Sequence, residues 1–335
     1  LFFSYLYKSL KFSIQKNEHE KVQYYDFNTR QIEIFNKRFT EVREKAMSYS
    51  IMNPKLLNYY EHGICNNIKL FCMTKNEIDI LPYFIMWYSY IVGINNIHIV
   101  DNRSTDGSWE YLQKIQNTNK AFPASRTPDD FHFKNKGLYL SNMCERNKNK
   151  CKYVLILDTD EFLFSLNNDI VSQFSILDEY PASVVCRTPD FIYDNDSNII
   201  DIKHMNFIDD TNLCFRGNYA KCIFKTESLN SFMPIRDNGN HNLHIKDAVV
   251  THLRLLHFHS RGEHKSIQKK MSLLSGYKYN LNVETLNKLV KGHPARHVAK
   301  ELLDYVLNID KITYDHKLKR NKYTVLRDFF TKHNM

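Results

Sequence analysis

The chain has 335 residues, 43% hydrophobic and 13% aromatic, which is enough to bury a large core in one or two domains. Its 46 lysines and arginines exceed its 37 aspartates and glutamates by 9, which favours anionic partners such as nucleotides, nucleic acid or an acidic membrane surface. Its seven cysteines include no C-x-x-C pair, which argues against a zinc ribbon and against a regular disulfide framework.

Residues 1–62 predict a helical N-terminal extension without a visible site. Leu1 to Tyr7 is an apolar run far too short to span a bilayer, and no run of about 18 apolar residues occurs anywhere in the sequence. We interpret this run as one face of an N-terminal helix, and the end of a lost membrane anchor stays an alternative. The expected location is therefore cytoplasmic or peripheral to a membrane.

From residue 63 the sequence alternates between strand and helix patterns, which predicts a doubly wound, mostly parallel α/β sheet. The first predicted strands are Ile68–Met73, Asn96–Val100, Phe131–Phe133 and Tyr153–Leu157. Predicted helices run from Ile78 to about Val92, through Trp109, Leu112 and Ile115, and from Gly137 to Lys148. Later strands are expected at Ala182–Arg187, within Phe215–Thr226 and within Val249–His259.

Tyr153–Leu157 is a continuous apolar run and predicts a central strand that is buried on both faces. Asp158 and Asp160 follow it directly, at the end of the strand where open α/β sheets bind ligands. In an extended chain their carboxylates would point to the same side, about 6 to 7 Å apart. One Mg²⁺ or Mn²⁺ could bridge that gap, directly and through water. The alternative is that these acids cap a helix or face water.

Two other predicted strands also end in turns rich in acids and amides, at residues 74–77 and 101–107. In a parallel sheet both turns would lie on the same edge as Asp158. The sequence contains no G-x-G-x-x-G and no G-x-x-x-x-G-K-[ST], which disfavours a dinucleotide dehydrogenase or a P-loop NTPase. H-E-x-x-H and G-x-S-x-G are also missing, so zincin and α/β-hydrolase readings have no support.

Three segments resemble the leading motifs of family 2-like glycosyltransferases, most closely those of the family 92 branch. That branch has the pattern K-N-E, then Y-D-N-x-S-x-D, then D-x-D-E-F. The matching segments are Met73–Glu77, Ile99–Gly107 and Leu157–Leu163. The resemblance covers roughly residues 65 to 270, and the order and spacing of the motifs agree, which is more specific than any single motif.

The resemblance implies a GT-A fold, in which one Rossmann-like domain at residues 63–260 binds a nucleotide sugar, usually a UDP-sugar, with Mn²⁺ or Mg²⁺. Residues 261–335 are then expected to form a helical C-terminal cap. Asn102 stands where many family 2 members have a second aspartate, and its amide can also hydrogen-bond a base or ribose. The positions expected at the nucleotide are Thr74, Asn76, Glu77, Asp101, Asn102 and Arg103.

The resemblance also implies a metal site. Asp158 and Asp160 fall on the D-x-D pair, where Asp158 is expected to contact both the nucleotide sugar and the metal, and Asp160 is the more direct metal contact. Related enzymes carry a histidine followed by an aromatic residue further on, and here His257 is the expected third ligand, with His259 as the alternate. The alternative is that these histidines only fill the surface or the core.

Two further roles depend on chemistry that the transfer of a sugar requires. Lys221 and Arg261 are expected to meet the diphosphate, where cations stabilise the departing charge, and ordinary solvated charges are the alternative. Asp190 follows a predicted strand and is the candidate for the carboxylate that removes the acceptor's proton. Asp237 and Glu263 are rivals for that role.

The expected function is metal-dependent transfer of a sugar, with inversion, from a nucleotide donor to a hydroxyl of a glycan or glycoconjugate. No nucleic-acid partner is expected, and contact of the basic C-terminal tail with an anionic membrane stays open. One alternative is a sugar nucleotidyltransferase, although such enzymes typically carry a glycine-rich phosphate loop that is missing here. The other is a catalytically inactive carbohydrate-binding relative.

Overall fold

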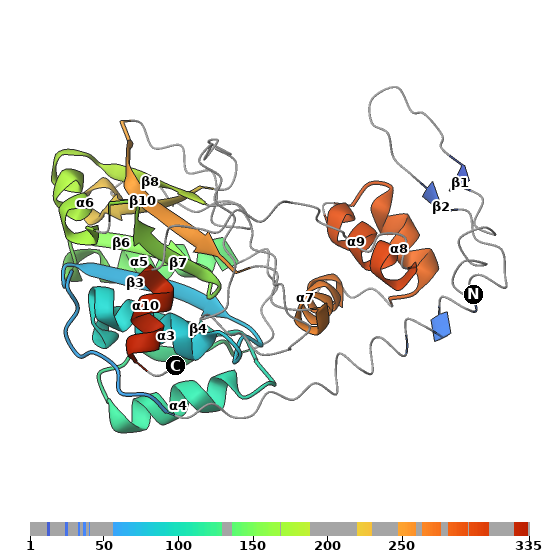
Figure 1. Cartoon of the computed structure of the whole chain (residues 1–335), viewed down its shortest axis with the longest axis horizontal. Coiled ribbons are helices and arrows are strands. Elements are labelled where there is room, and N and C mark those ends of the chain that lie inside the picture. The colour runs from blue at the N-terminus through green and yellow to red at the C-terminus, as the bar shows by residue number, and fades with distance from the viewer. Residues whose placement is uncertain are drawn as a thin grey trace. The chain divides into compact units, whose positions relative to one another are not determined.

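The structure is a computed structural model with two compact units (Figure 1). Unit 1 combines Leu1–Ser50 with Gly262–Lys317, and unit 2 combines Ile51–Arg261 with Leu318–Met335. The predicted domain boundaries at residues 62 and 260 stay a prediction. The described residues are 12–13, 24–25, 33, 36–37, 40, 56–128, 136–167, 169–187, 220–229, 247–258, 263–275, 281–293, 295–307 and 325–333.

Unit 2 is built on an eight-stranded sheet with the order β5-β4-β3-β6-β9-β8-β10-β7. Its strands are β3 (Ile68–Thr74), β4 (Ile97–Asp101), β5 (Ala124–Arg126), β6 (Tyr153–Leu157), β7 (Glu161–Ser165), β8 (Ala182–Arg187), β9 (Lys221–Lys225) and β10 (Val249–His257). The neighbours from β5 to β6 pair in parallel, whereas β9 runs antiparallel to both β6 and β8. β10 is parallel to β8 and antiparallel to β7. The predicted α/β class is thus confirmed. The four strands β5, β4, β3 and β6 form the parallel half of the sheet.

Helices cover both faces of this sheet. Its helices are α3 (Leu81–Val92), α4 (Ser108–Thr118), α5 (Lys136–Asn147), α6 (Ile170–Ile176) and α10 (Val325–Lys332), with short 3-10 turns η1 (Ile94–Asn96), η3 (Lys148–Lys150), η4 (Leu177–Glu179) and η7 (Thr226–Leu229). Side chains alternate along β3, so that Leu70 and Cys72 join the core with α3 and α4 while Phe71 joins the core with α5. β6 is buried along its whole length, as predicted for the central strand.

The structure differs from the sequence prediction at three places. Residues 158–160 form a turn instead of extended chain, because β6 ends at Leu157 and β7 begins at Glu161. β7 itself was not predicted, and it pairs with the distant β10. The strand next to β4 is the short β5, while the predicted strand at residues 131–133 lies outside the described residues.

The C-terminal helix α10 belongs to unit 2 and packs on α3, as Figure 1 shows. The rings of Phe329 and Trp87 lie 5.0 Å apart and edge to face, and Phe330 is fully buried. The Tyr60 hydroxyl also lies 2.9 Å from His333 Nε2. α3 in turn contacts β7, since Trp87 Nε1 donates to the carbonyl of Leu163 at 2.9 Å. The end of the chain therefore supports the helix that backs β7.

Unit 1 contains three described helices, α7 (Glu263–Ser275), α8 (Val283–Val290) and α9 (Arg296–Leu307), with a core of their own. Helix patterns were predicted for this part of the chain. In the predicted helical extension, residues 33, 36, 37 and 40 are helical, but β1 (Phe12–Ser13) and β2 (Tyr24–Tyr25) form an antiparallel pair. Within the described parts of the chain, we find no helix with the length and apolar character needed to cross a bilayer.

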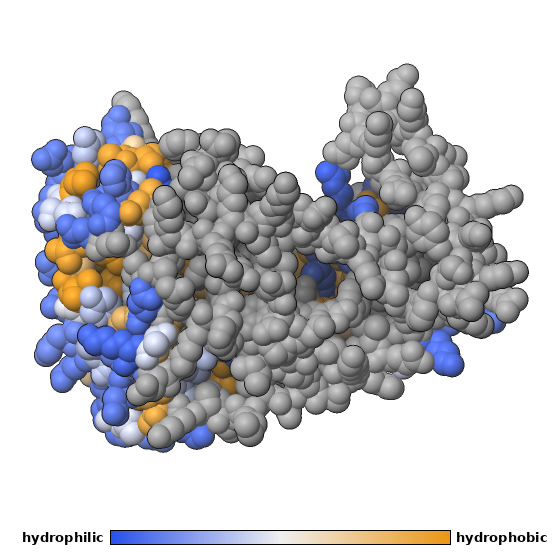
Figure 2. Space-filling view, in the orientation of Figure 1, coloured by the Kyte–Doolittle hydropathy of each residue, from blue (hydrophilic) through white to orange (hydrophobic). Residues whose placement is uncertain are grey.

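Some large apolar side chains remain exposed on unit 2. Val171 and Ile176 of α6, Tyr180 after it, and Val250 of β10 belong to this set. Figure 2 shows hydrophobic patches between hydrophilic ones on the side of the unit where α6 and β8 lie in Figure 1. Exposed single apolar residues are common on protein surfaces, so these patches do not by themselves define a site.

Candidate active site

Three turns and the end of β5 meet at one edge of the sheet. Thr74 at the end of β3 pairs with Asp101 at the end of β4, and Asp101 pairs with Arg126 of β5. β6 runs parallel to β3 and ends beside it, with Cys72 opposite Leu157. The predicted convergence of the three motif turns at the carboxyl ends of the parallel strands is therefore present in the fold.

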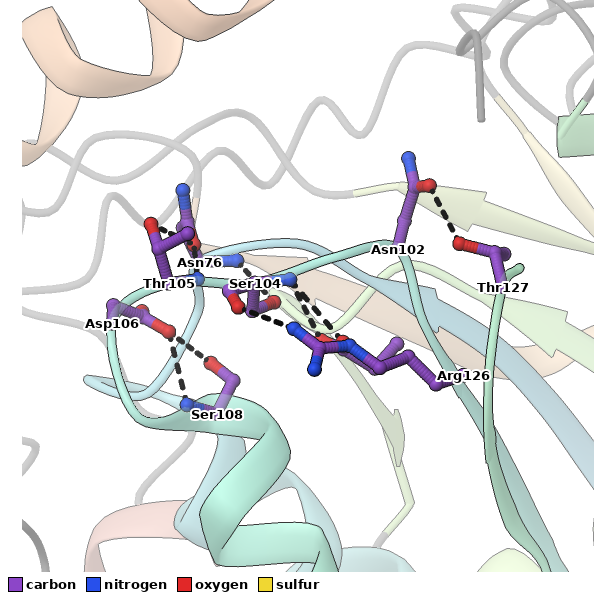
Figure 3. Close-up of polar contacts among 9 residues, drawn as sticks. Asn76, Asn102, Ser104, Thr105, Asp106, Ser108, Arg126 and Thr127 are labelled. Carbon is purple, nitrogen blue, oxygen red and sulfur yellow. Dashed lines mark hydrogen bonds and ion pairs between the residues drawn. The ribbon is translucent and has the colours of Figure 1, made fainter. Parts of the chain in front are cut away.

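We call residues 74–77 and 101–108 the hydrogen-bonded turns, and Figure 3 shows their contacts. Asp101 is fully buried, its carboxylate accepts from the backbone amide of Ser104, and Arg126 Nε lies 2.9 Å from its Oδ2. Burial raises the pKa of Asp101, although the bonds from Ser104 and the charge of Arg126 oppose that shift. Arg126 also donates to the Ser104 carbonyl at 2.8 Å and lies over the Trp109 ring.

Asn76 joins the first turn to the second (Figure 3). Its backbone amide donates to Ser104 Oγ at 2.8 Å, and its side-chain Oδ1 accepts from the amide of Thr105 at 2.7 Å. Asn76 and the exposed Arg103 have φ values of 55° and 58°. Asparagine tolerates this left-handed conformation better than most residues, whereas arginine in it is strained. Such strain is typical of functional turns.

Asp106 fixes the same two turns from the other side (Figure 3). Its Oδ2 accepts from the amide of Ile78 at 3.0 Å, and its Oδ1 accepts from both the amide and the hydroxyl of Ser108. The hydroxyl of Ser108 in turn accepts from the amide of Glu77 at 3.1 Å. A single carboxylate thus orders the start of α4 and the chain leading to α3.

Asn102 lies next to Thr127, whose hydroxyl donates to Asn102 Oδ1 at 3.2 Å (Figure 3). The backbone amide of Asn102 donates to the Thr74 carbonyl at 2.8 Å. The Thr159 hydroxyl lies 3.5 Å from Thr74 Oγ1, so the turn after β6 reaches the turn after β3. The structure therefore brings five of the predicted nucleotide positions together at this edge, together with the exposed Arg103.

The turn after β6 belongs to a second group of residues, which we call the charged cluster: Lys136, Asp158, Asp160, Glu161, Lys221 and His257. The Lys136 ammonium donates to Asp158 Oδ1, and the Lys221 ammonium donates to Asp158 Oδ2 at 3.0 Å. Burial alone would raise the pKa of Asp158, but these two ammonium groups hold it well below its usual range. Asp158 is therefore a carboxylate that two lysines neutralise.

Glu161 completes the buried charges around Lys221. Its Oε2 accepts from the amide of Asp158 at 2.9 Å and lies 3.3 Å from Lys221 Nζ. Burial raises the pKa of Glu161, against the opposing charge of Lys221. Burial would lower the pKa of Lys221, but Asp158 and Glu161 raise it. Among the described residues nothing hydrogen-bonds Glu161 Oε1, so this network holds one unsatisfied acceptor.

Asp160 points to a different partner from Asp158. Its Oδ1 lies 3.6 Å from His257 Nε2, and both side chains are buried. The backbone holds the pair in place, because Glu161 is opposite His257 in the β7–β10 ladder and the Phe258 amide donates to the Asp160 carbonyl. The expectation that residues 158–160 are extended is wrong, since they form a turn, but the charge of Asp160 still acts on the Asp158 carboxyl and opposes the lowering of its pKa.

The Asp160–His257 pair can be tested for its fit to Mn²⁺ or Mg²⁺. Two ligand atoms about 2.1 Å from one ion and at a right angle lie roughly 3 Å apart, so 3.6 Å needs only a small adjustment. No group of three or more His, Cys, Asp or Glu side chains forms a metal-sized cluster within the described residues. The remaining ligands would be phosphate and water oxygens, as Mg²⁺ sites often use. The pair fits such an ion, and the metal assignment stays a prediction.

Several predicted site residues lie outside the described residues: Asp190, Arg261, the alternate ligand His259 and the rival base Asp237. Glu263 begins α7 in unit 1. Conversely, sequence reasoning missed Lys136, Glu161, Arg126 and Thr127. Lys136 and Glu161 carry no local signal of burial, while Arg126 ends a short strand with no apolar alternation and Thr127 follows it. Arg126 and Thr127 could have been predicted only from the position of β5 next to β4.

No family model and no curated protein matches the chain. Solved structures that resemble it include S. aureus TarS, with a TM-score of 0.35 and 12% identity over 72% of this chain. The chain covers 43% of that TarS chain. A TarS 1–349 structure in complex with UDP-GlcNAc has a TM-score of 0.36 and 13% identity, with 76% of each chain covered.

Another similar structure is the mannosyltransferase PcManGT from Pyrobaculum calidifontis in complex with GDP-Man and Mn²⁺. It has a TM-score of 0.32 and 11% identity, with 84% of each chain covered. At these scores the similarity adds nothing to the case for a function, which depends on the residues at the edge of the sheet.

Proposed function

We propose that this protein is a glycosyltransferase of the GT-A type, related to the family 92 branch, that uses a UDP-sugar and Mn²⁺ or Mg²⁺. The observation that carries the proposal is the meeting of the three motif turns at one edge of parallel strands, beside a buried pair of Asp160 and His257. This edge is where open α/β sheets bind their ligands. The preference for uridine comes from the motif resemblance alone.

In the proposed complex the hydrogen-bonded turns hold the nucleoside. Asn76, Asp101 and Asn102 supply amide and carboxylate groups for the base and the ribose, with Thr74, Glu77 and Arg103 around them. Their dense mutual bonds support this role, because a preorganised site loses little conformational freedom on binding.

In the charged cluster, Asp160 and His257 would hold the metal, whose charge would neutralise the donor's phosphates when it is bound. The ion pairs of Lys221 with Asp158 and Glu161 would fix the turn that presents Asp160. Lys221 and Arg261 remain proposed contacts of the diphosphate.

The proposed reaction transfers the sugar with inversion to an acceptor hydroxyl of a glycan or glycoconjugate. A carboxylate, for which Asp190 is our candidate, takes the hydroxyl proton while the acceptor oxygen bonds to the anomeric carbon. The bond from that carbon to the diphosphate breaks, and its electron pair leaves with UDP. Fixed cations beside the phosphates stabilise the charge that develops there.

A thermal-shift screen of UDP- and GDP-sugars, each with and without Mn²⁺ or Mg²⁺, tests the proposal. A donor at 100 times its Kd should raise Tm by roughly 5 to 10 °C, and only with the metal. Asp160→Asn should lose this shift, whereas the exposed control Glu145→Gln on α5 should keep it. If no nucleotide sugar shifts Tm with either metal, the proposal is wrong.

Product analysis then separates the proposed reaction from the alternatives. Transfer of the sugar releases free UDP, whereas a sugar nucleotidyltransferase would release pyrophosphate. A donor that binds but gives neither product with any acceptor glycan would indicate an inactive relative.

A further inference from the structure

Asp158 pairs with the ammonium groups of two lysines, Lys136 and Lys221, and these differ in their surroundings. Lys221 is completely buried and contacts both Asp158 and Glu161. Lys136 is the first residue of α5 and reaches the other carboxylate oxygen of Asp158. The side chain of Lys136 is 5% exposed and that of Asp158 is 24% exposed, so it is mainly the carboxylate of this pair that is open to solvent. Both lysines are thus buried, and Lys136 is the one that is not completely so.

The formal charges of the charged cluster nearly cancel. Its three carboxylates and two lysines sum to −3 + 2 = −1 when His257 is neutral. A divalent cation brought to Asp158 would meet two ammonium groups that already compensate the carboxylate, and like charges at such distances repel. An anion at the same place would instead find two cations and the start of α5, where backbone amides favour negative charge. The two ammonium groups, and not the cluster as a whole, are therefore the part that favours a phosphate group.

We propose that Lys136 is a diphosphate-binding residue. In the free protein its ammonium group pairs with Asp158, and when the donor binds, the ammonium group pairs with a phosphate oxygen instead. The inference rests on the proposed function and adds a residue to that site. When Lys136 moves to the phosphate, one oxygen of Asp158 becomes available to the metal that arrives with the donor. The lysine therefore links the binding of the metal to the binding of the diphosphate.

The test compares the wild type with Lys136→Met, using Mn²⁺ alone and Mn²⁺ with inorganic pyrophosphate as probes. Pyrophosphate reports on the phosphate contacts without depending on the base or the sugar. Free Mn²⁺ is followed by electron paramagnetic resonance, and pyrophosphate binding by calorimetry. Lys148→Met is the matched control, because Lys148 lies just beyond α5 and pairs with Glu145 at the surface.

Lys136→Met should change the two affinities in opposite directions. Pyrophosphate should bind roughly 10- to 100-fold more weakly, because a charge-assisted contact is lost. Mn²⁺ alone should bind several-fold more tightly, because Asp158 is no longer shared with Lys136. Partial unfolding would weaken both, so the opposite shifts cannot come from damage to the fold. Lys136→Arg keeps the cation and should retain most of the pyrophosphate affinity, and the control should match the wild type.

The inference is overturned if Lys136→Met binds pyrophosphate as tightly as the wild type, or if both affinities fall together in a variant whose circular dichroism and Tm match those of the wild type. In those cases a wild type that binds UDP with Mn²⁺ leaves the proposed function intact. A wild type that binds neither pyrophosphate nor UDP in the presence of Mn²⁺ overturns the inference and the proposed function together.

Discussion

The two groups of residues at the edge of the sheet are held by different forces. The hydrogen-bonded turns depend mainly on backbone amides bound to Asn76, Ser104 and Asp106, together with an ion pair between Asp101 and Arg126. The charged cluster depends on opposite charges taken out of water around Asp158. Turns of the first kind lose stability in small steps when one contact is removed. A cluster of the second kind fails abruptly, because removing one charge leaves its partner buried and uncompensated.

The largest expected effect is on stability in the charged cluster. Lys221→Met should lower the free energy of unfolding by about 3 to 5 kcal/mol, because Glu161 and one oxygen of Asp158 lose a buried partner. Lys225→Met, on the same strand, is the control, and its loss should stay within about 1 kcal/mol. Urea unfolding measures both. A loss for Lys221→Met as small as that of the control would show that the buried ion pairs contribute little.

The next effect is on activity. Asp160→Asn should reduce turnover by about 100- to 1,000-fold, because the residue proposed to hold the metal loses its charge. The free energy of unfolding should change little, since the variant keeps the shape of the side chain and leaves the ion pairs of Asp158 with its two lysines in place. Turnover is measured with whichever nucleotide sugar raises Tm of the wild type, and Glu145→Gln serves as the control. Near-normal turnover would exclude Asp160 as a metal ligand.

A smaller effect is expected in the hydrogen-bonded turns. Asp106→Ala removes the acceptor of two backbone amides and one hydroxyl, and should cost about 1 to 3 kcal/mol of unfolding free energy. Asp106→Asn keeps one carbonyl oxygen and should cost less. Urea unfolding of both variants ranks them. A loss for Asp106→Ala equal to that of Lys221→Met would remove the contrast between the two groups.

The last effect, gradual because it builds up with pH, is a dependence of stability on pH that comes from β4. Burial, followed by the charges of Lys69 and Lys150, lowers the pKa of His98 from 6.5 to about 3. Because the folded state resists protonation, this contribution to stability is complete above pH 6.5 and is lost as the pH falls towards 3. Between these two pKa values the loss approaches about 1.4 kcal/mol per pH unit. In His98→Gln, unfolding free energies measured between pH 6 and 4 should decline less steeply, and identical slopes would contradict the assignment.

Local sequence patterns were enough to predict most elements of the parallel half. The predicted strand at Ile68–Met73 matches β3, and the apolar run at Tyr153–Leu157 is β6. The helix predicted from Ile78 begins only at Leu81, because the preceding residues form turns fixed by Asp106. In these elements each hydrophobic residue packs on the adjacent layer of the core, so the spacing of hydrophobic residues in the local sequence is enough to predict the element.

Contacts between distant parts of the chain could not be predicted in the same way. β7 follows the D-x-D turn directly, and it is a strand only because β10 supplies its partner. The positions of Asp158 and Asp160 at the end of the central strand were predicted, but the turn between them was not. Lys136 and Lys221 lie far from Asp158 in the sequence, and Lys221 looks like any polar residue at the start of a strand. Burial of a lysine is a property of the assembled sheet.

The docking of α10 on α3 has a consequence for biosynthesis. Residues 325–332 emerge from the ribosome after the whole of the sheet and after the three helices of unit 1. Until then the aromatic face of α3 around Trp87 is not covered by α10, so the nascent chain exposes a hydrophobic surface to which chaperones can bind. Trp87 and Tyr88 of α3 donate hydrogen bonds to carbonyl groups of β7, the strand that begins with Glu161. The site is thus among the last parts of unit 2 to reach its final form.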